Sequence, residues 1–138
     1  YISRFAAKHE AQLFCEEKSV EQALRDYFTA VATCFTSKET PAGCFMINTS
    51  ATLAASSKEI ANTVKSRHAM QEETLSAFLA QRQQRGELPA QCNPQLLAQY
   101  LSCILQGMSI SAREGATLEK LQNISETTLR LWPELLKI

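Results

Sequence analysis

The apolar residues between positions 20 and 35 recur every three or four positions, and this spacing constrains the fold more than any other feature. They are Val20, Ala23, Leu24, Tyr27, Phe28, Val31 and Phe35. On a helix these positions form one stripe that has to be buried against another element. The 138 residues include only 4 glycines and 4 prolines. The sequence therefore predicts an all-α fold, an antiparallel bundle of about six helices.

Caps and breaks place the ends of the predicted helices. We expect helices over residues 2–17, from 20 to the break "TSKETPAG", over 44–55, from 56 or 57 to 86, from 93 to 115, and over 117–131. Ser19 and Asn93 are residue types that cap helix N-termini. Pro94 suits a first helical position, and Gly86 suits the left-handed position after a helix. In the long fourth helix we expect the charged residues to be in solvent; these are Lys58, Lys65, Glu72, Glu73, Arg82 and Arg85.

Composition limits the class of protein. Lys and Arg together number 14, as do Asp and Glu, so the chain has no basic excess of the kind that DNA-binding domains usually show. The 5 cysteines are odd in number and form no C-x-x-C pair, which fits a reducing compartment. No apolar run is long enough to span a membrane. We expect a single domain over residues 1–138, located in the cytoplasm, in a chain that has lost residues before Tyr1.

The last two predicted helices carry more apolar and small residues than one domain of this size needs. Gly107 lies inside the first of them, where glycine costs about 1 kcal/mol relative to alanine and commonly marks a close approach by another backbone or by a ligand. The alternative is that Gly107 is a tolerated defect in the helix. We hypothesise a homodimer in which each subunit contributes two helices to a four-helix bundle. The predicted interface residues are Leu101, Leu105, Gly107, Leu118, Leu121, Ile124 and Thr128. Packing within one chain is the alternative, and a monomeric mass by light scattering would support it.

An ordered set of segments resembles the C-terminal domain of TetR/AcrR-family transcriptional regulators. The set comprises "TPAGCFMINTSA", "AFLAQRQQRGEL", "CNPQLLAQYLSCILQGMSI" and the terminal "TTLRLW". The resemblance covers nearly the whole chain, although no single motif is diagnostic. It implies a two-domain regulator that represses transcription, whose N-terminal helix-turn-helix binds operator DNA while this domain dimerises and binds a small effector. Residues 1–17 would match the helix that connects the two domains.

The chain departs from that pattern because the helix-turn-helix is absent. DNA binding is therefore implied only for a longer parent protein, and no residue of this chain is assigned to reading bases. If an effector occupies a cavity next to the break at Pro41 and Gly43, the helix that begins at Tyr1 has to shift. Such a shift would alter the spacing of two DNA-binding domains in a dimer, since half-sites lie about one helical turn apart.

The predicted effector pocket is mostly apolar with a few polar groups. The candidate lining residues are Tyr27, Phe28, Cys44, Phe45, Asn48, His68, Tyr100, Ile104 and Met108. Asn48 is the best polar candidate, and the alternative is an amide satisfied within its own helix. A reactive Cys44 at a helix start is weighed against an inert buried thiol. An apolar or aromatic compound is the expected effector.

Other functions have weaker support in the sequence. Two histidines are too few to argue for a metal site, and His68 with Glu72 one turn later reads as a solvated pair or a packed imidazole. The chain shows no catalytic set at a motif spacing and no phosphate loop, so we predict no enzymatic activity and no cofactor. A helical small-molecule-binding or protein-interaction bundle without a DNA-binding role remains the alternative.

Overall fold

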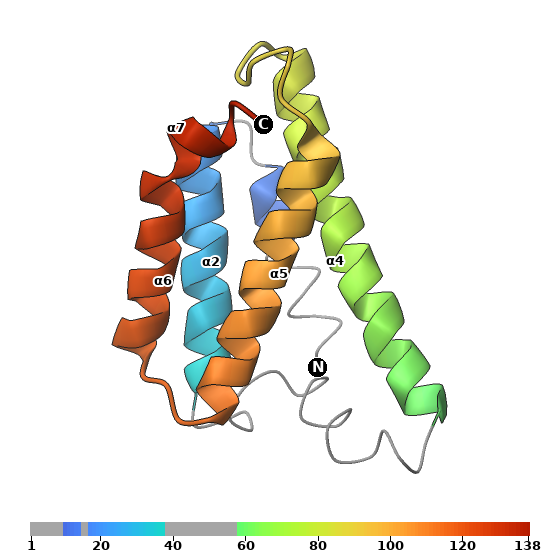
Figure 1. Ribbon diagram of the computed structural model, residues 1–138, viewed down its shortest axis with the longest axis vertical. Coiled ribbons are helices and arrows are strands. Elements are labelled where there is room, and N and C mark those ends of the chain that lie inside the picture. Colours follow the sequence, from blue (N-terminus) through green and yellow to red (C-terminus); the bar gives the residue numbers. More distant parts are fainter. Residues whose placement is uncertain (1–9, 15–16, 38–57) are drawn as a thin grey trace.

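The computed structural model describes residues 10–14, 17–37 and 58–138, and for residues 59–61, 63 and 64 it describes the backbone alone. The helices are α2 (Val20–Thr36), α4 (Lys58–Gln84), α5 (Pro94–Arg113), α6 (Leu118–Arg130) and α7 (Trp132–Leu135) (Figure 1). Residues 10–13 are also helical, and the described residues include no strand. The prediction of an all-α fold is confirmed. The short helix predicted over 44–55 and the cap predicted at Ser56 or Ser57 lie outside the described residues.

The two predicted N-caps that lie within the described residues, Ser19 and Asn93, each satisfy a backbone donor at a helix start. The Ser19 hydroxyl accepts from the backbone N–H of Gln22 at 3.2 Å. The Asn93 side chain accepts from two backbone N–H groups of α5, at 3.0 and 3.2 Å, and Pro94 follows it. Thr117, predicted as the first residue of the last helix, is instead the N-cap of α6. These bonds replace helix-internal partners that the first turn lacks.

Helix α4 ends next to Gly86, as the sequence predicts. Gly86 has a φ of 80°, a left-handed conformation that glycine adopts without steric cost. The N–H of Glu87 donates to the carbonyl of Arg82, and the N–H of Gly86 donates to that of Gln83, both at 3.0 Å. This pair of bonds is the Schellman arrangement, and it satisfies two carbonyls at the end of the helix.

The bundle is organised around α5. Helix α2 packs against α6 and α5, while α5 packs along α4, to which the loop of residues 85–93 joins it (Figure 1). From that connection α4 and α5 diverge along their lengths. The largest fully buried side chains include Phe28, Phe78, Leu97, Leu105 and Trp132. One continuous apolar core therefore joins all five labelled helices.

The prediction that Arg82 lies in solvent is wrong, because its side chain is completely buried. Its Nη1 donates to the backbone carbonyl of Lys18 at 2.6 Å and to the Glu87 carboxylate at 2.8 Å. Its guanidinium carbon also lies 5.2 Å from the centroid of the Phe78 ring. A buried cation is tolerated when it is paired and hydrogen-bonded. Arg82 thus connects the turn before α2 to the end of α4, and does not solvate the surface.

The C-terminal end of the chain folds back onto the start of α5. Helix α6 ends at Arg130, and Pro133 lies within the short α7 and does not simply mark a stop. The backbone N–H of Asn93 donates to the carbonyl of Ile138 at 3.3 Å. Within the described residues, no helix has both the length and the apolar character needed to cross a lipid bilayer.

Candidate functional site

Helix α5 carries two separate lines of apolar residues. The inner line is buried, each member at 1% exposure, and consists of Leu97, Leu101, Leu105 and Met108. The outer line is exposed and consists of Leu96, Tyr100, Cys103, Gly107 and Ile110. Leu96 and Ile110 each remain 46% exposed and Tyr100 remains 40% exposed. The outer positions follow the alternating spacing of four and three residues with which helices pair along a common seam.

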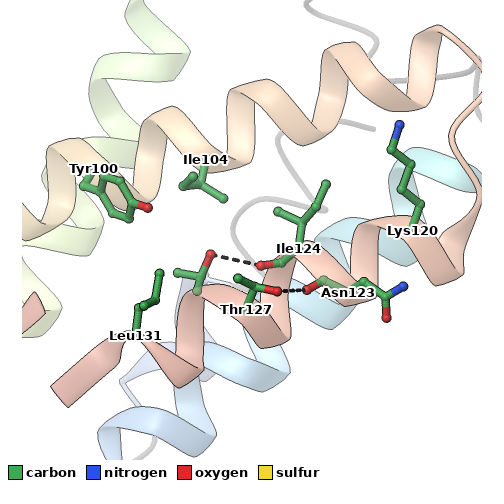
Figure 2. A pocket seen from close by; sticks show the side chains of 8 residues that line it. Tyr100, Ile104, Lys120, Asn123, Ile124, Thr127 and Leu131 are labelled. Carbon is green, nitrogen blue, oxygen red and sulfur yellow. Dashed lines mark hydrogen bonds between the residues drawn. The ribbon is translucent and has the colours of Figure 1, made fainter. Parts of the chain in front are cut away.

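A groove runs between α5 and α6, and Tyr100 is the residue of the outer line that lines it. Its volume is about 330 Å³, and its lining residues are Tyr100, Ile104, Lys120, Asn123, Ile124, Thr127, Thr128 and Leu131. Figure 2 shows Tyr100 and Ile104 on α5 facing Ile124 and Leu131 across it. The lining positions Lys120, Ile124 and Thr127 on α6, followed by its C-cap Leu131, again alternate between four and three residues. The two helices therefore present two ridges with a valley between them, the geometry into which another helix packs.

The threonine hydroxyls in the groove are already satisfied. Thr127 Oγ1 donates to the carbonyl of Asn123 at 2.8 Å, and Thr128 Oγ1 donates to that of Ile124 at 3.0 Å (Figure 2). Both bonds stay within α6, so neither hydroxyl requires an outside partner. An apolar surface can therefore cover this part of the groove without leaving those donors unpaired.

Gly107 has free space around it within the described structure. A Cβ built on Gly107 would meet no heavy atom within 4 Å, apart from those of its chain neighbours and its own helix backbone. The expected close approach to this glycine is thus not made by any other described part of the same chain. A glycine at this position is therefore consistent with a close approach by a group from outside the described residues.

The predicted dimer residues divide into two groups. Leu101, Leu105, Leu121 and Thr128 are at most 4% exposed and belong to the core of the single chain. Side chains buried this deeply have almost no surface left for a partner, so we remove them from the interface. Leu118 and Ile124 are half-buried and Gly107 is exposed, and these three remain available for contact.

A polar stripe on α4 lies opposite the N-terminal segment and α2. It consists of Arg67, Gln71 and Thr74, which are spaced so that they share one face of the helix. Gln71 Nε2 donates to the Tyr27 hydroxyl at 3.3 Å. The stripe lies one turn before Phe78 and so interrupts the apolar face of α4.

Burial dominates the electrostatics of this polar stripe. It raises the pKa of the Glu10 carboxyl, while the Arg67 charge and the Thr74 hydrogen bond partly oppose the increase. Burial likewise raises the pKa of Tyr27 to about 12. The Tyr27 phenol therefore remains protonated at neutral pH and serves as a hydrogen-bonding group.

The predicted effector residues do not all line one pocket. Tyr27, Phe28 and Met108 are buried in the core, and the Tyr27 hydroxyl faces α4. Tyr100 and Ile104 line the groove toward α6. We therefore assign them to that groove and no longer count them among the predicted effector-binding residues. His68 is half-buried on α4, and burial lowers its pKa, which favours the neutral imidazole. Cys44, Phe45 and Asn48 lie outside the described residues.

Sequence reasoning missed three exposed apolar residues, Leu96, Ile110 and Leu131, as interface candidates. The spacing of the outer line was visible in the sequence, because Leu96, Tyr100, Cys103, Gly107 and Ile110 follow one another by four and three residues.

In the described part of the chain, no three His, Cys, Asp or Glu side chains gather into a set that could hold a metal ion.

Comparisons with known proteins agree with the fold. Residues 20–127 match the family described as "Tetracyclin repressor-like, C-terminal domain". Two solved structures of the TetR family transcriptional regulator CifR, both cysteine mutants complexed with 26-base-pair operator DNA, superpose with TM-scores of 0.83 and 0.82. They are 21% and 18% identical in sequence, cover 96% and 94% of this chain, and each is covered over 69% of its own length. At such identities the likeness concerns the fold alone.

A curated relative is much closer in sequence. The chain is 72% identical over 137 residues to the HTH-type transcriptional repressor ComR of Escherichia coli (strain K12). The match covers 99% of this chain and 65% of that relative, so the chain spans slightly less than two thirds of the relative's length. On the family match over 108 positions and this identity, the chain belongs to the TetR family and carries its C-terminal domain.

Proposed function

We propose that the chain is the effector-binding and dimerisation domain of a one-component transcriptional repressor. The observation that carries this proposal is the 72% identity to a protein named as a transcriptional repressor, sustained over 99% of the chain. The chain matches only 65% of that relative. Operator DNA would accordingly be bound by a separate N-terminal domain of the parent protein, in the cytoplasm, and residues 10–14 would belong to the segment that leads to it.

Dimerisation through α5 and α6 is supported by the outer apolar line and the groove. Two copies related by a two-fold axis would place both α5 helices and both α6 helices in one four-helix bundle. The outer line would then become the centre of an interface, with Gly107 allowing close approach of the partner. Monomeric proteins seldom leave a regular apolar seam of this kind in solvent.

A small apolar or aromatic effector is supported by the interior of the domain, where α4 carries polar groups within an apolar face. Pockets of this kind use a few polar groups to orient a mostly apolar ligand. Effector binding would favour one of two dimer geometries and so release DNA, since an effector acts by its differential affinity for the two states.

The test uses the full-length protein and DNA from the region upstream of its own gene. We expect fluorescence anisotropy to detect specific binding that competes with unlabelled specific DNA more strongly than with unrelated DNA of equal length. We also expect sedimentation to give the mass of a dimer. Binding equal to that of unrelated DNA would contradict the repressor proposal, and a monomeric mass would contradict the dimer.

A further inference from the structure

Two arginines lie on the inward face of α4, and their guanidinium groups are in different situations. The half-buried Arg67 precedes the buried Phe78 by eleven residues, or three helical turns, and Arg82 follows Phe78 by one turn, so the three share a face. Arg82 donates to the Lys18 carbonyl and to the Glu87 carboxylate. Arg67 has a buried Nε without an acceptor, and no ion pair joins it to an acid within the described ranges.

An inward-facing arginine of this kind lowers the stability of the ligand-free fold. Taking its N–H groups out of water costs free energy that only an acceptor or an opposite charge offsets. The N-terminal half of α4, which contains Arg67, has diverged from α5, so that helix supplies no acceptor at this level (Figure 1). A buried donor left unsatisfied calls for a physical explanation, and a partner absent from the ligand-free protein is one.

The Tyr27 hydroxyl is a second donor beside Arg67. Gln71, one turn after Arg67, donates to this hydroxyl at 3.3 Å and so joins α4 to α2. Burial raises the pKa of Tyr27 to about 12, against an opposing contribution from the Arg67 charge, so the phenol keeps its proton. Among the described residues the hydroxyl accepts this one bond and has no acceptor for its own proton. Arg67 and Tyr27 therefore lie on either side of Gln71, each with a proton to donate.

A carboxylate is the chemical group that fits these donors. Its two oxygens match the Nε–H and one Nη–H of a guanidinium in a bidentate pair, and an oxygen has a further lone pair for the phenol. Arg67 supplies a single positive charge, and the acidic Glu10 interacts with that charge, so a dianion such as phosphate is poorly compensated. Burial raises the pKa of Glu10, and a protonated Glu10 does not repel a bound anion.

We propose that the effector is an apolar or aromatic carboxylic acid, bound as its carboxylate by Arg67 and the Tyr27 hydroxyl between α4 and α2. This assignment rests on the proposed function, because it names the chemical class of the effector that the domain senses. The apolar body of the acid supplies most of the contact area, and the carboxylate fixes its orientation. Gln71 is a positioning residue, since it holds the Tyr27 hydroxyl in place.

The direct test is NMR of the arginine Nε–H groups in full-length protein labelled at arginine, with Arg67→Lys identifying the Arg67 signal. Benzoate and octanoate are the probes, and each is compared with its uncharged amide at equal ionic strength. Both acids should shift the Arg67 signal, whereas benzamide and octanamide should not. The absence of a shift with either acid up to about 10 mM, which saturates even a millimolar site, would overturn the proposal. An equal shift with inorganic phosphate would overturn the carboxylate class.

Variants locate the benzoate response within the domain. Arg67→Gln should abolish the rise in Tm that benzoate causes, and Tyr27→Phe, which removes only the hydroxyl, should weaken benzoate binding about fivefold. Arg113→Gln, at an exposed position on α5, should respond like wild type. Glu10→Gln should not weaken binding. A loss with Arg113→Gln or Glu10→Gln equal to that with Arg67→Gln would contradict the assignment.

The ligand-free protein distinguishes a binding residue from a structural one. Arg67→Met removes the donors without acceptors and keeps an apolar stem, so it should raise Tm by about 2–4 °C. A structural arginine predicts a lower Tm, and that result would overturn the proposal. Should Arg67→Met fail to fold, Arg67→Leu makes the same comparison.

Operator binding separates this proposal from the one on which it rests. If the wild-type full-length protein binds no upstream DNA specifically, the repressor proposal fails, while the NMR titration still decides whether Arg67 binds carboxylates. If the protein binds that DNA and the Arg67 signal does not respond to either acid, only the chemical class of the effector is wrong.

Discussion

The inner and outer lines of α5 have similar apolar composition and opposite environments. Leu101 and Leu105 are each 1% exposed, whereas Leu96 and Ile110, on the same helix, are each 46% exposed. The inner line is covered by other helices of the chain, whereas the outer line is exposed and its residue Tyr100 lines an open groove with α6. The comparison teaches that helical spacing identifies the apolar residues but does not say which of them a single chain can cover.

The largest expected effect comes from the inner line. Leu105→Ala should lower the free energy of unfolding by about 2–5 kcal/mol, because truncation leaves a cavity that the core cannot fill. Urea denaturation should show this loss at every protein concentration. Leu96→Ala, the matched change on the outer line, should cost less than about 1 kcal/mol in the monomer and chiefly alter how stability depends on concentration. Equal losses at both positions would remove the distinction between the two lines.

The buried contacts of Arg82 on α4 should contribute more to the free energy of unfolding than the exposed ion pair of Arg85 does. Arg82→Met should lower the free energy of unfolding by about 2–3 kcal/mol, because the Lys18 carbonyl and Glu87 lose a common donor. Urea denaturation again supplies the measurement. Arg85→Met is the control, since Arg85 pairs with the same glutamate but its side chain is 36% exposed. A stability equal to that of the control would mean that the buried contacts of Arg82 contribute little.

A charge on the outer line should separate the proposed dimer without unfolding the chain. Ile110→Glu should weaken dimerisation about 30-fold, or about 2 kcal/mol, because the carboxylate loses water at the centre of the interface. Sedimentation equilibrium measures this change, and circular dichroism should show unchanged helix content. Gln122→Glu adds the same charge at an exposed position outside the groove and should leave the dimer intact.

The smallest effect concerns the exposed pair that joins α6, one wall of the groove, to α2. Arg25 Nε donates to Glu126 at 2.8 Å, and this bond holds the pKa of Glu126 below its ordinary value of 4.5. The stability from the pair is fully present above that value and is lost as pH falls through the lowered pKa. Glu126→Gln should therefore cost less than about 1 kcal/mol at neutral pH, and urea curves for the two proteins should converge below pH 4.5.

Local features of the fold were predictable from the sequence because they depend on neighbouring residues. Ser19, Asn93 and Gly86 determine helix ends through bonds within a few positions, and all three predictions are confirmed. The burial of Arg82 was not predictable, since its partner Lys18 lies 64 positions earlier in the chain. The division of α5 was equally hidden, because both apolar lines satisfy helical spacing and only the packing of α4 and α2 against α5 separates them.

The most direct test of the central claim, that the outer line of α5 meets a second copy, is cross-linking through Cys103. This exposed cysteine lies midway along the outer line, so a two-fold axis there would bring two copies of it together. With a short bismaleimide, the full-length protein should form a covalent dimer that Cys103→Ser abolishes and Cys92→Ser, at a buried position, does not. A dimer by sedimentation whose cross-linking is unaffected by Cys103→Ser, or no covalent dimer at all, would contradict the account.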